Sequence, residues 1–290
     1  MGLRNNFSIL KPVVKANFVF LRRYPRAFIP FLITALASSL VLLILYLIPM
    51  SPLNSLLGQP VTDFYGAQYL HYPYNFTLLP RLFSNARNFL VNPLMGSLMA
   101  AIAVGMVCNY HRGREPAFFR NFNKAMRRFI HIAGCMVLMV TVSYLLSRAV
   151  PYLVTKLFPG ISRPALINSA VTFFVLAGAE CFFVYTFIAI MYKRMKFGGA
   201  LKESFVFSGR LYLVTFALIF SCRLLDFGAT LIVLRQPYLM DRFVPDITLL
   251  ILFFGIIVAV FSDALVYTLA ANLYIFKEHI GESLSNDEVQ

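Results

Sequence analysis

The sequence predicts an all-α integral membrane protein with six transmembrane helices, arranged as three repeats of one interfacial amphipathic helix and two spans. Three observations lead to this class. The 290 residues are 59% hydrophobic and only 13% charged, whereas soluble domains carry about 25% charged residues. Six apolar runs are long enough to cross a bilayer, and a short basic and aromatic phrase recurs before the spans.

The six apolar runs approach or exceed the length of about 20 residues that a helix needs to cross the hydrocarbon core. They are Ala27–Met50, Phe89–Tyr110, Phe129–Ser147, Ile167–Tyr192, Leu211–Leu234 and Ile247–Tyr274. The first run is too long for a signal-peptide core and lacks a small-residue cleavage site, so we expect it to be retained. We predict one membrane domain over residues 1–290.

The connection Ser51–Asn88 is the longest one between two predicted spans. It is rich in rings, with Tyr65, Tyr69, Tyr72, Tyr74 and Phe76. Such side chains favour the boundary between membrane and water. We therefore expect this connection to form a cap on the outer surface, with the second span starting at Phe89.

Basic residues predict the orientation of the spans. The segment before the first span, the connections after spans two and four, and Lys277 together hold 18 Lys and Arg residues, whereas the three opposite connections hold seven. This asymmetry places both termini in the cytoplasm, and a bacterial inner membrane is the expected location. The net charge of +14 favours anionic headgroups as partners. Nucleic acid is not expected, because the basic residues flank apolar spans and do not form one solvated patch.

The basic phrase occurs three times, with basic residues eight positions apart at its two ends. The copies are KANFVFLRR (Lys15–Arg23), RNFNKAMRR (Arg120–Arg128) and KESFVFSGR (Lys202–Arg210). The last two copies are offset by 82 residues, and the same offset relates Tyr110, Tyr192 and Tyr274 at the ends of the even-numbered spans. A shared offset predicts repeat units of approximately 7–110, 113–192 and 196–274. A flexible cytoplasmic tail is expected over 278–290.

The three copies are predicted to be helices that lie flat in the inner headgroup region, with their apolar faces in the acyl chains. The residues expected to contact anionic lipid are Lys15, Arg22, Arg23, Arg120, Arg127, Arg128, Lys202 and Arg210. The alternative is that each segment simply begins the span that follows it. Pro25, Pro116 and the Gly198–Gly199 pair favour breaks beside the three segments.

An amphipathic phrase that leads into a span, three times over in six helices, resembles a loose group of bacterial membrane proteins of unknown function. Two further features carry the resemblance: ALKESF entering span five, and a Tyr followed by a basic residue leaving span four. The group includes the YciC-type family and the membrane domain attached to some glycerophosphodiester phosphodiesterases. The resemblance implies a six-helix membrane fold over most of the chain. It does not imply phosphodiesterase activity, because this sequence contains no such catalytic domain.

Four ionisable residues fall deep within the predicted spans: Glu180, Arg223, Asp226 and Asp263. Each costs on the order of 3 kcal/mol at the bilayer centre unless it is paired or hydrated. At a rise of 1.5 Å per residue, Glu180, Arg223 and Asp263 lie about 16 to 20 Å from the inner boundary, so they can meet near the midplane. Asp226 reaches Arg223 as an i, i+3 neighbour. The cluster is either a structural ion-pair network that fixes helix register, or a site for a proton, a cation or a cationic substrate.

Small residues in span two predict close helix packing. Gly96 with Ala100, and Ala101 with Gly105, have the small-xxx-small spacing that lets two helices approach. The four cysteines fall in or at the ends of apolar runs and are expected to fill helix contacts. No Cys and His cluster has metal-ligand spacing, so no metal and no cofactor are predicted.

No HExxH, GxSxG, Walker A or GxGxxG motif is present in the sequence, so we do not expect an enzyme. The favoured function is a membrane scaffold, partner subunit or lipid-interacting protein, with anionic lipid and a membrane or cytoplasmic protein as partners. The alternative is a transporter or channel-like protein for an ion, a small polar solute or a lipid. That alternative uses the charges of Glu180, Arg223 and Asp263.

Overall fold

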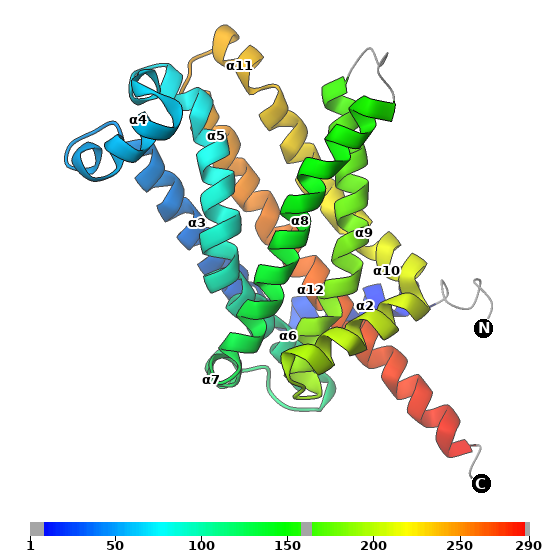
Figure 1. Cartoon of the computed structure of the whole chain (residues 1–290). Coiled ribbons are helices and arrows are strands. Elements are labelled where there is room, and N and C mark those ends of the chain that lie inside the picture. Colours follow the sequence, from blue (N-terminus) through cyan, green and yellow to red (C-terminus); the bar gives the residue numbers. More distant parts are fainter. Residues whose placement is uncertain (1–8, 158–163, 288–290) are drawn as a thin grey trace.

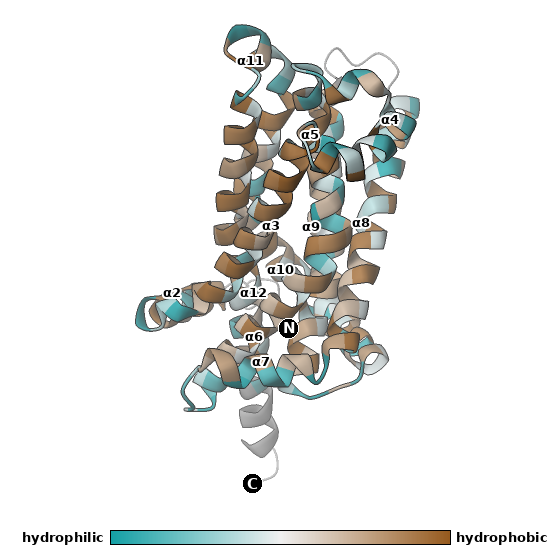
Figure 2. Ribbon diagram, turned by 90° about the vertical axis from the view of Figure 1, so that its left-hand side faces the viewer, coloured by the Kyte–Doolittle hydropathy of each residue, from teal (hydrophilic) through white to brown (hydrophobic). Residues whose placement is uncertain are grey.

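The computed structural model describes residues 9–157 and 164–287 (Figure 1). These residues are predominantly helical, and they include no strand. Six helices are long and apolar enough to cross a membrane, as the sequence predicts: Pro25–Leu47, Tyr74–His111, Phe129–Leu157, Ala165–Tyr192, Phe197–Leu234 and Ile247–Glu278. Figure 2 shows apolar residues along the middle of the bundle and more polar ones at its two ends. This fits an integral membrane protein.

The elements follow one another with short connections, and η denotes a 3-10 or π-helical segment. Their order is α2 (Leu10–Arg23), η1 (Pro25–Phe28), α3 (Ile29–Leu47), η2 (Asn54–Gly58), α4 (Gln59–Tyr65), η3 (Ala67–Leu70), α5 (Tyr74–Ala86), η4 (Arg87–Gly96), α6 (Ser97–His111), α7 (Phe118–Met126), α8 (Phe129–Leu157), α9 (Pro164–Tyr192), α10 (Phe197–Leu234), α11 (Gln236–Arg242) and α12 (Ile247–Asp287). Most of the tail predicted over 278–290 continues α12, which extends to Asp287.

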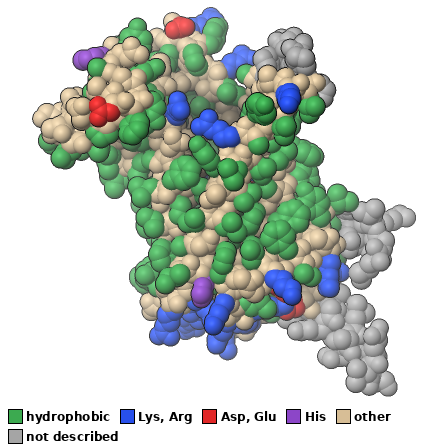
Figure 3. Space-filling view, viewed as in Figure 1, with side chains coloured by type: hydrophobic (Ala, Val, Ile, Leu, Met, Phe, Trp, Pro, Cys, Tyr) green, Lys and Arg blue, Asp and Glu red, His purple; other side chains and the backbone are tan. Residues whose placement is uncertain are grey.

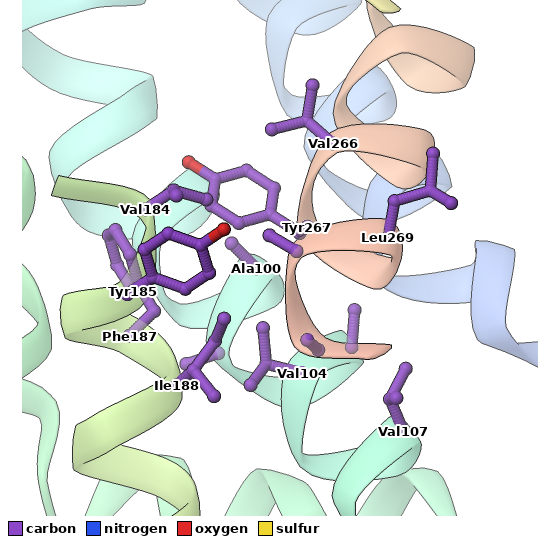
Figure 4. Packing of buried hydrophobic residues seen from close by; sticks show 14 of the residues in the cluster. Ala100, Val104, Val107, Val184, Tyr185, Phe187, Ile188, Val266, Tyr267 and Leu269 are labelled. Atoms are coloured by element: carbon purple, nitrogen blue, oxygen red, sulfur yellow. The ribbon is translucent and has the colours of Figure 1, made fainter. Parts of the chain in front are cut away.

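The even-numbered spans form the inside of the bundle. Within the most apolar 18 residues of each span, the buried share is 72% for the span of α6, 61% for that of α9 and 44% for that of α12. The same share is only 22% for the spans of α3 and α8, and 17% for that of α10. Figure 4 shows where the three inner helices meet, with Val104 of α6, Tyr185 of α9 and Tyr267 of α12 among the packed side chains. The outer helices expose large apolar side chains such as Leu36, which is 70% exposed. A surface of this kind fits contact with lipid.

The predicted cap Ser51–Asn88 is wrong in its second half. α5 begins at Tyr74 and continues through η4 into α6, so the second span starts 15 residues earlier than expected. The missed signal is the spacing of Phe76, Leu79 and Phe83, which places all three on one helical face. This face is buried against Leu42 of α3 and against α12. Burial of this face stabilises the helix despite Pro80 within it.

The three predicted interfacial segments are connected to their spans in different ways. α2 is separated from α3 by η1, which begins at Pro25, and α7 is separated from α8 by a turn at Arg127 and Arg128. The third segment and span five form one continuous helix, α10. Its backbone is non-helical only at Leu211 (φ −124°, ψ 25°). A kink at Leu211 thus joins this segment to span five, and the break near Gly198–Gly199 lies just before Phe197, where α10 begins.

One end of the bundle carries α2, α7 and the first part of α10, and we call it the basic end. Figure 3 shows Lys and Arg side chains gathered there, and α4 and α11 lie at the opposite, distal end (Figure 1). α2 packs on α12, α7 on α6, and α10 on α9. Each contact includes a buried or partly buried hydrogen bond: Asn272 Nδ2 to Asn17 Oδ1 at 2.9 Å, Asn109 Nδ2 to Asn121 Oδ1 at 3.0 Å, and Ser204 Oγ to the Phe182 carbonyl at 2.6 Å.

Of the predicted packing residues in span two, Gly105 makes the closest approach. A Cβ atom at this position would lie 2.8 Å from Asn121 Oδ1 and 2.9 Å from Met191 Cε, so α7 and α9 both depend on the missing side chain. Ala100 and Ala101 are buried in the core. A Cβ at Gly96 would meet Asn92 of its own helical segment at 3.3 Å. Helix approach is therefore closest in the part of α6 near the basic end.

Candidate functional site

Arg223 on α10 is held by Glu180 on α9 through two parallel hydrogen bonds. Nε donates to Glu180 Oε2 at 2.9 Å, and Nη2 donates to Oε1 at 2.5 Å. This bidentate geometry is the strongest form of arginine–carboxylate pairing. The two side chains are only 17 and 12% exposed. The pair therefore fixes the guanidinium plane between two helices.

The third nitrogen of Arg223 turns toward two aspartates. Nη1 donates to Asp226 Oδ2 at 2.9 Å and to Asp263 Oδ1 on α12 at 2.6 Å. The Ser262 hydroxyl lies 2.6 Å from Asp226 Oδ2 and 3.3 Å from Arg223 Nη1. The structure thus brings all four charged residues singled out by the sequence into one cluster that links α9, α10 and α12. Ser262 is a member that sequence reasoning missed, because a serine in a span carries no charge signal.

A cavity of about 400 Å³ lies against the aspartate side of this cluster. Its lining residues come from α5, η4, α10 and α12: Pro80, Phe83, Ser84, Arg87, Asn88, Asn92, Arg223, Asp226, Ala229, Thr230, Val233, Ile251, Leu252, Gly255 and Asp263. Most of them lie toward the distal end, because α10 runs toward that end and α12 runs away from it. Glu180 is not among them. Asp226 and Asp263 therefore face the cavity, whereas Glu180 pairs with Arg223 outside the cavity lining.

One wall of the cavity is a polar face of α5 and η4. Asn92 Nδ2 is 3.4 Å from Asn88 Oδ1, and Asn88 Nδ2 is 3.5 Å from Ser84 Oγ. Arg87 lies on the same wall. The signal that could have found it is the spacing of Ser84, Asn88 and Asn92, which is helical. It was missed because this segment was predicted as a surface connection, where polar residues are unremarkable.

Thr230 connects this cavity with a neighbouring one. Thr230 lines both the 400 Å³ cavity and a second cavity of about 320 Å³ between α8, α9 and α10. The second cavity is also lined by Asn168 and Thr172, whose Oδ1 and Oγ1 atoms are buried without a hydrogen-bond partner in the described part of the chain. Polar groups without protein partners in a cavity of this size are typically hydrated.

The residues predicted to contact lipid lie at the basic end. Seven of them are exposed: Lys15, Arg22, Arg23, Arg120, Arg127, Lys202 and Arg210. Arg128 is the exception, because it is partly buried and its Nη1 donates to the Ile190 carbonyl at 2.8 Å. Arg128 therefore satisfies a carbonyl in the last turn of α9.

A second charged group at the basic end joins three helices. Lys193 Nζ lies 2.8 Å from Glu203 Oε1 and 3.0 Å from Glu278 Oε1, and the Tyr274 hydroxyl donates to Glu203 Oε1 at 2.9 Å. Burial by itself lowers the pKa of Lys193. Its hydrogen bonds to Glu203, Tyr274 and Glu278 outweigh this effect, so the net shift of the pKa is upward. This ion-pair network ties the end of α9 to α10 and α12.

Comparison of the chain with models of known protein families, with characterised proteins and with solved structures finds no match. Within residues 9–157 and 164–287, no group of His, Cys, Asp and Glu has the arrangement of a metal site. All four cysteines are buried and unpaired with one another.

Proposed function

We propose that the chain is a membrane carrier or channel-like protein for a small polar or charged solute, and that the cavity over Asp226 and Asp263 is its binding site. The observation that supports this is the 400 Å³ cavity with two aspartates at its inner end. Its volume is within the range of about 300–1,000 Å³ that is typical of small-molecule sites. Charged residues are expensive inside a membrane and commonly mark solute pathways.

The four charged residues of the cluster differ in burial, and this difference favours a carrier function over a purely structural ion-pair network. A structural network gains most when its charges are fully buried and mutually satisfied. The Glu180–Arg223 pair has this character. Asp226 and Asp263 instead have side chains that are 28 and 26% exposed, and both line the cavity. We infer that the first pair positions the cluster and that the aspartates meet the solute.

Charged thiol reagents test whether water reaches the cavity. We expect Thr230→Cys to react with water-soluble cationic and anionic methanethiosulfonates added from the distal side. The matched control is Ile232→Cys, two residues further along α10, where the side chain is exposed on the bundle surface outside the cavity. Ile232→Cys should stay unreactive because lipid covers it. Equal protection of both positions would contradict the proposal.

Uptake into vesicles tests the function itself. Purified protein in lipid vesicles should accumulate labelled ethanolamine or β-alanine, or pass protons, faster than protein-free vesicles. Asp226→Asn and Asp263→Asn should lower this flux at least tenfold. Asp241→Asn, on exposed α11 at the distal end, is the matched control and should not change it. Flux that is the same in all three variants and the wild type would reject a carrier role for the cavity.

The proposal includes an orientation and an architecture. Both termini lie in the cytoplasm of a bacterial inner membrane, and the cavity then adjoins the outer side. Support comes from the Lys and Arg side chains that gather at the basic end (Figure 3). Three units, each an amphipathic helix followed by two spans, close into a ring in which every amphipathic helix packs on the last span of the unit before it. The contacts of α2 with α12, α7 with α6 and α10 with α9 support this ring.

A second candidate function is a scaffold or lipid-interacting protein that acts through its basic end. The seven exposed Lys and Arg residues on α2, α7, the turn after it and α10 favour this candidate, since clustered basic residues bind anionic headgroups. It predicts that vesicles rich in phosphatidylglycerol stabilise the protein more than uncharged ones. Replacement of Arg22 and Arg23 by Gln should remove part of that difference. An equal melting temperature in both lipids would argue against this candidate.

A further inference from the structure

Arg87 presents a cation to the cavity without a direct carboxylate contact. It is the first residue of η4, and it lines both the 400 Å³ cavity and a small adjoining void that Asp263 also lines. Its Nε is buried and has no hydrogen-bond partner among the described residues. Arg87 also forms no ion pair within that part of the chain. Arg223 differs, because all three of its nitrogens are engaged.

Asp226 and Asp263 each keep one oxygen available. Asp226 uses Oδ2 for Arg223 and Ser262, and Asp263 uses Oδ1 for Arg223. The opposite oxygens accept no hydrogen bond from a described residue. They are not buried unsatisfied atoms either, since those are confined to other side chains in the described ranges. The free oxygens are therefore accessible from the cavity and can accept from a donor in it.

The charged residues around the cavity are of two kinds: two that pair with each other, and three others that include both a cation and anions. Glu180 and Arg223 offset each other through their bidentate contact. The remainder is the cation of Arg87 and the anions of Asp226 and Asp263. A ligand that is only anionic meets two like charges, and a ligand that is only cationic offers no counter-charge to Arg87. A ligand with one group of each sign complements both walls.

We propose that the cavity binds a small zwitterion, with its acidic group on Arg87 and its ammonium group on Asp226 and Asp263. This inference rests on the proposed carrier function and adds the class of solute. The polar side chains of Ser84, Asn88 and Asn92 contact the middle of such a ligand. Two sources share this chemistry: a free amino acid-like solute, and the headgroup of phosphatidylethanolamine. Both fit a cavity of about 400 Å³.

Calorimetry on the full-length protein in uncharged detergent tests the inference with four probes. β-Alanine and phosphoethanolamine carry both charges, ethanolamine carries only the cation, and propionate carries only the anion. We expect both zwitterions to bind at least tenfold more tightly than either singly charged probe. Arg87→Gln should weaken zwitterion binding about tenfold or more and change ethanolamine binding by less than about threefold, since removal of one partner of a close charge pair costs this much or more.

Two control variants distinguish a specific loss of binding from a general loss of folding. Arg81→Gln removes an exposed arginine on α5 that lies over the Tyr65 ring outside the cavity, and it should bind like the wild type. Arg87→Lys retains the charge and should recover part of the zwitterion affinity. A lipid source is distinguished in nanodiscs. If phosphatidylethanolamine is the ligand, discs that contain it should block phosphoethanolamine binding, whereas discs of phosphatidylglycerol should not.

The failure of this inference can be separated from failure of the carrier function. If ethanolamine binds as tightly as the zwitterions and Arg87→Gln has no effect, the zwitterion is wrong and a cation carrier remains. If none of the four probes binds while Thr230→Cys still reacts with water-soluble reagents, the zwitterion inference also falls. If Thr230→Cys is itself unreactive, the carrier function is overturned and the zwitterion with it.

Discussion

Glu180 and Arg223 form a bidentate ion pair between α9 and α10, with nitrogen–oxygen distances of 2.9 and 2.5 Å. The pair orients Arg223 so that its remaining nitrogen meets Asp226 and Asp263 at the inner end of the cavity. Glu180 therefore holds Arg223 in place, whereas the other two carboxylates border the cavity. Because the roles differ, substitutions of the acidic residues should have different effects.

Glu180→Gln should be the most destabilising of the acid-to-amide changes. The amide retains the shape but leaves Arg223 without its closest counter-charge, and removal of one partner from a buried pair costs about 3–5 kcal/mol. Thermal unfolding of the purified variant in detergent measures the loss. Glu115→Gln, an exposed residue before α7, is the control and should melt with the wild type. A Glu180→Gln protein as stable as the control would mean that Arg223 has other sufficient partners.

Gly105→Ala should destabilise the contact between α6 and its neighbours. The new Cβ would lie 2.8 Å from Asn121 Oδ1, which is held by its bond to Asn109, and 2.9 Å from Met191 Cε. Met191 can rotate away, but the anchored amide has to shift, and overpacking of this kind costs about 1–3 kcal/mol. Gly134→Ala on α8 is the matched control, because nothing lies within 4 Å of its Cβ position. The expected result is a lower melting temperature for the first variant and an equal or higher one for the second.

Lys193→Gln should weaken the connection between α9, α10 and α12 at the basic end. The lysine loses ion pairs at 2.8 and 3.0 Å, and since its side chain is 29% exposed, we expect a loss of about 1 kcal/mol. Because the fold raises the pKa of Lys193, its contribution is complete below the unfolded pKa of about 10.4 and is lost as the pH rises through the folded value. The difference in melting temperature between wild type and variant should thus be constant from about pH 7 to 9.5 and should shrink above about pH 10.4.

Lys196→Gln is the control for that series, since Lys196 is exposed beside the network. Its melting temperature should follow the wild type at every pH. A difference for Lys193→Gln that grows above pH 10.4 would contradict the raised pKa.

Cysteine labelling should establish which end of the bundle is cytoplasmic. Lys202→Cys at the basic end is expected to react with a membrane-impermeant maleimide only after the cells are opened. Arg242→Cys on α11 is expected to react in intact cells. Both side chains are exposed, and the four native cysteines are buried, so the wild type gives the background. The reverse pattern would invert the predicted topology and place the cavity on the cytoplasmic side.

The sequence was sufficient for the six spans, because length and hydropathy determine which segments lipid accepts. The boundaries of the second span were not predictable in the same way. Phe76, Leu79 and Phe83 gain their helical conformation from burial against α3 and α12, and that neighbour relationship is not visible in a single chain segment. The repeat and the orientation stay predictions that labelling and further structures can check.

For the site, charge was the useful signal. Glu180, Arg223, Asp226 and Asp263 stand out because ionised side chains are rare in spans. Ser262 and Asn88 carry no charge that would mark them in the sequence. Only the position of Ser262 beside Arg223 and of Asn88 in the cavity lining identifies them. Arg87 was misassigned, because a basic residue in a presumed outer connection reads as a topology signal. Its role depends on the start of a helix that the sequence placed too late.

The bend at Leu211 divides α10 into two parts with different surroundings. A single helix carries Ser204, fastened to α9 near one face of the membrane, and Asp226, which borders the cavity in the other half. With one non-helical residue between them, the two parts of α10 take different directions, so one helix contributes both to the basic end and to the wall of the cavity (Figure 1).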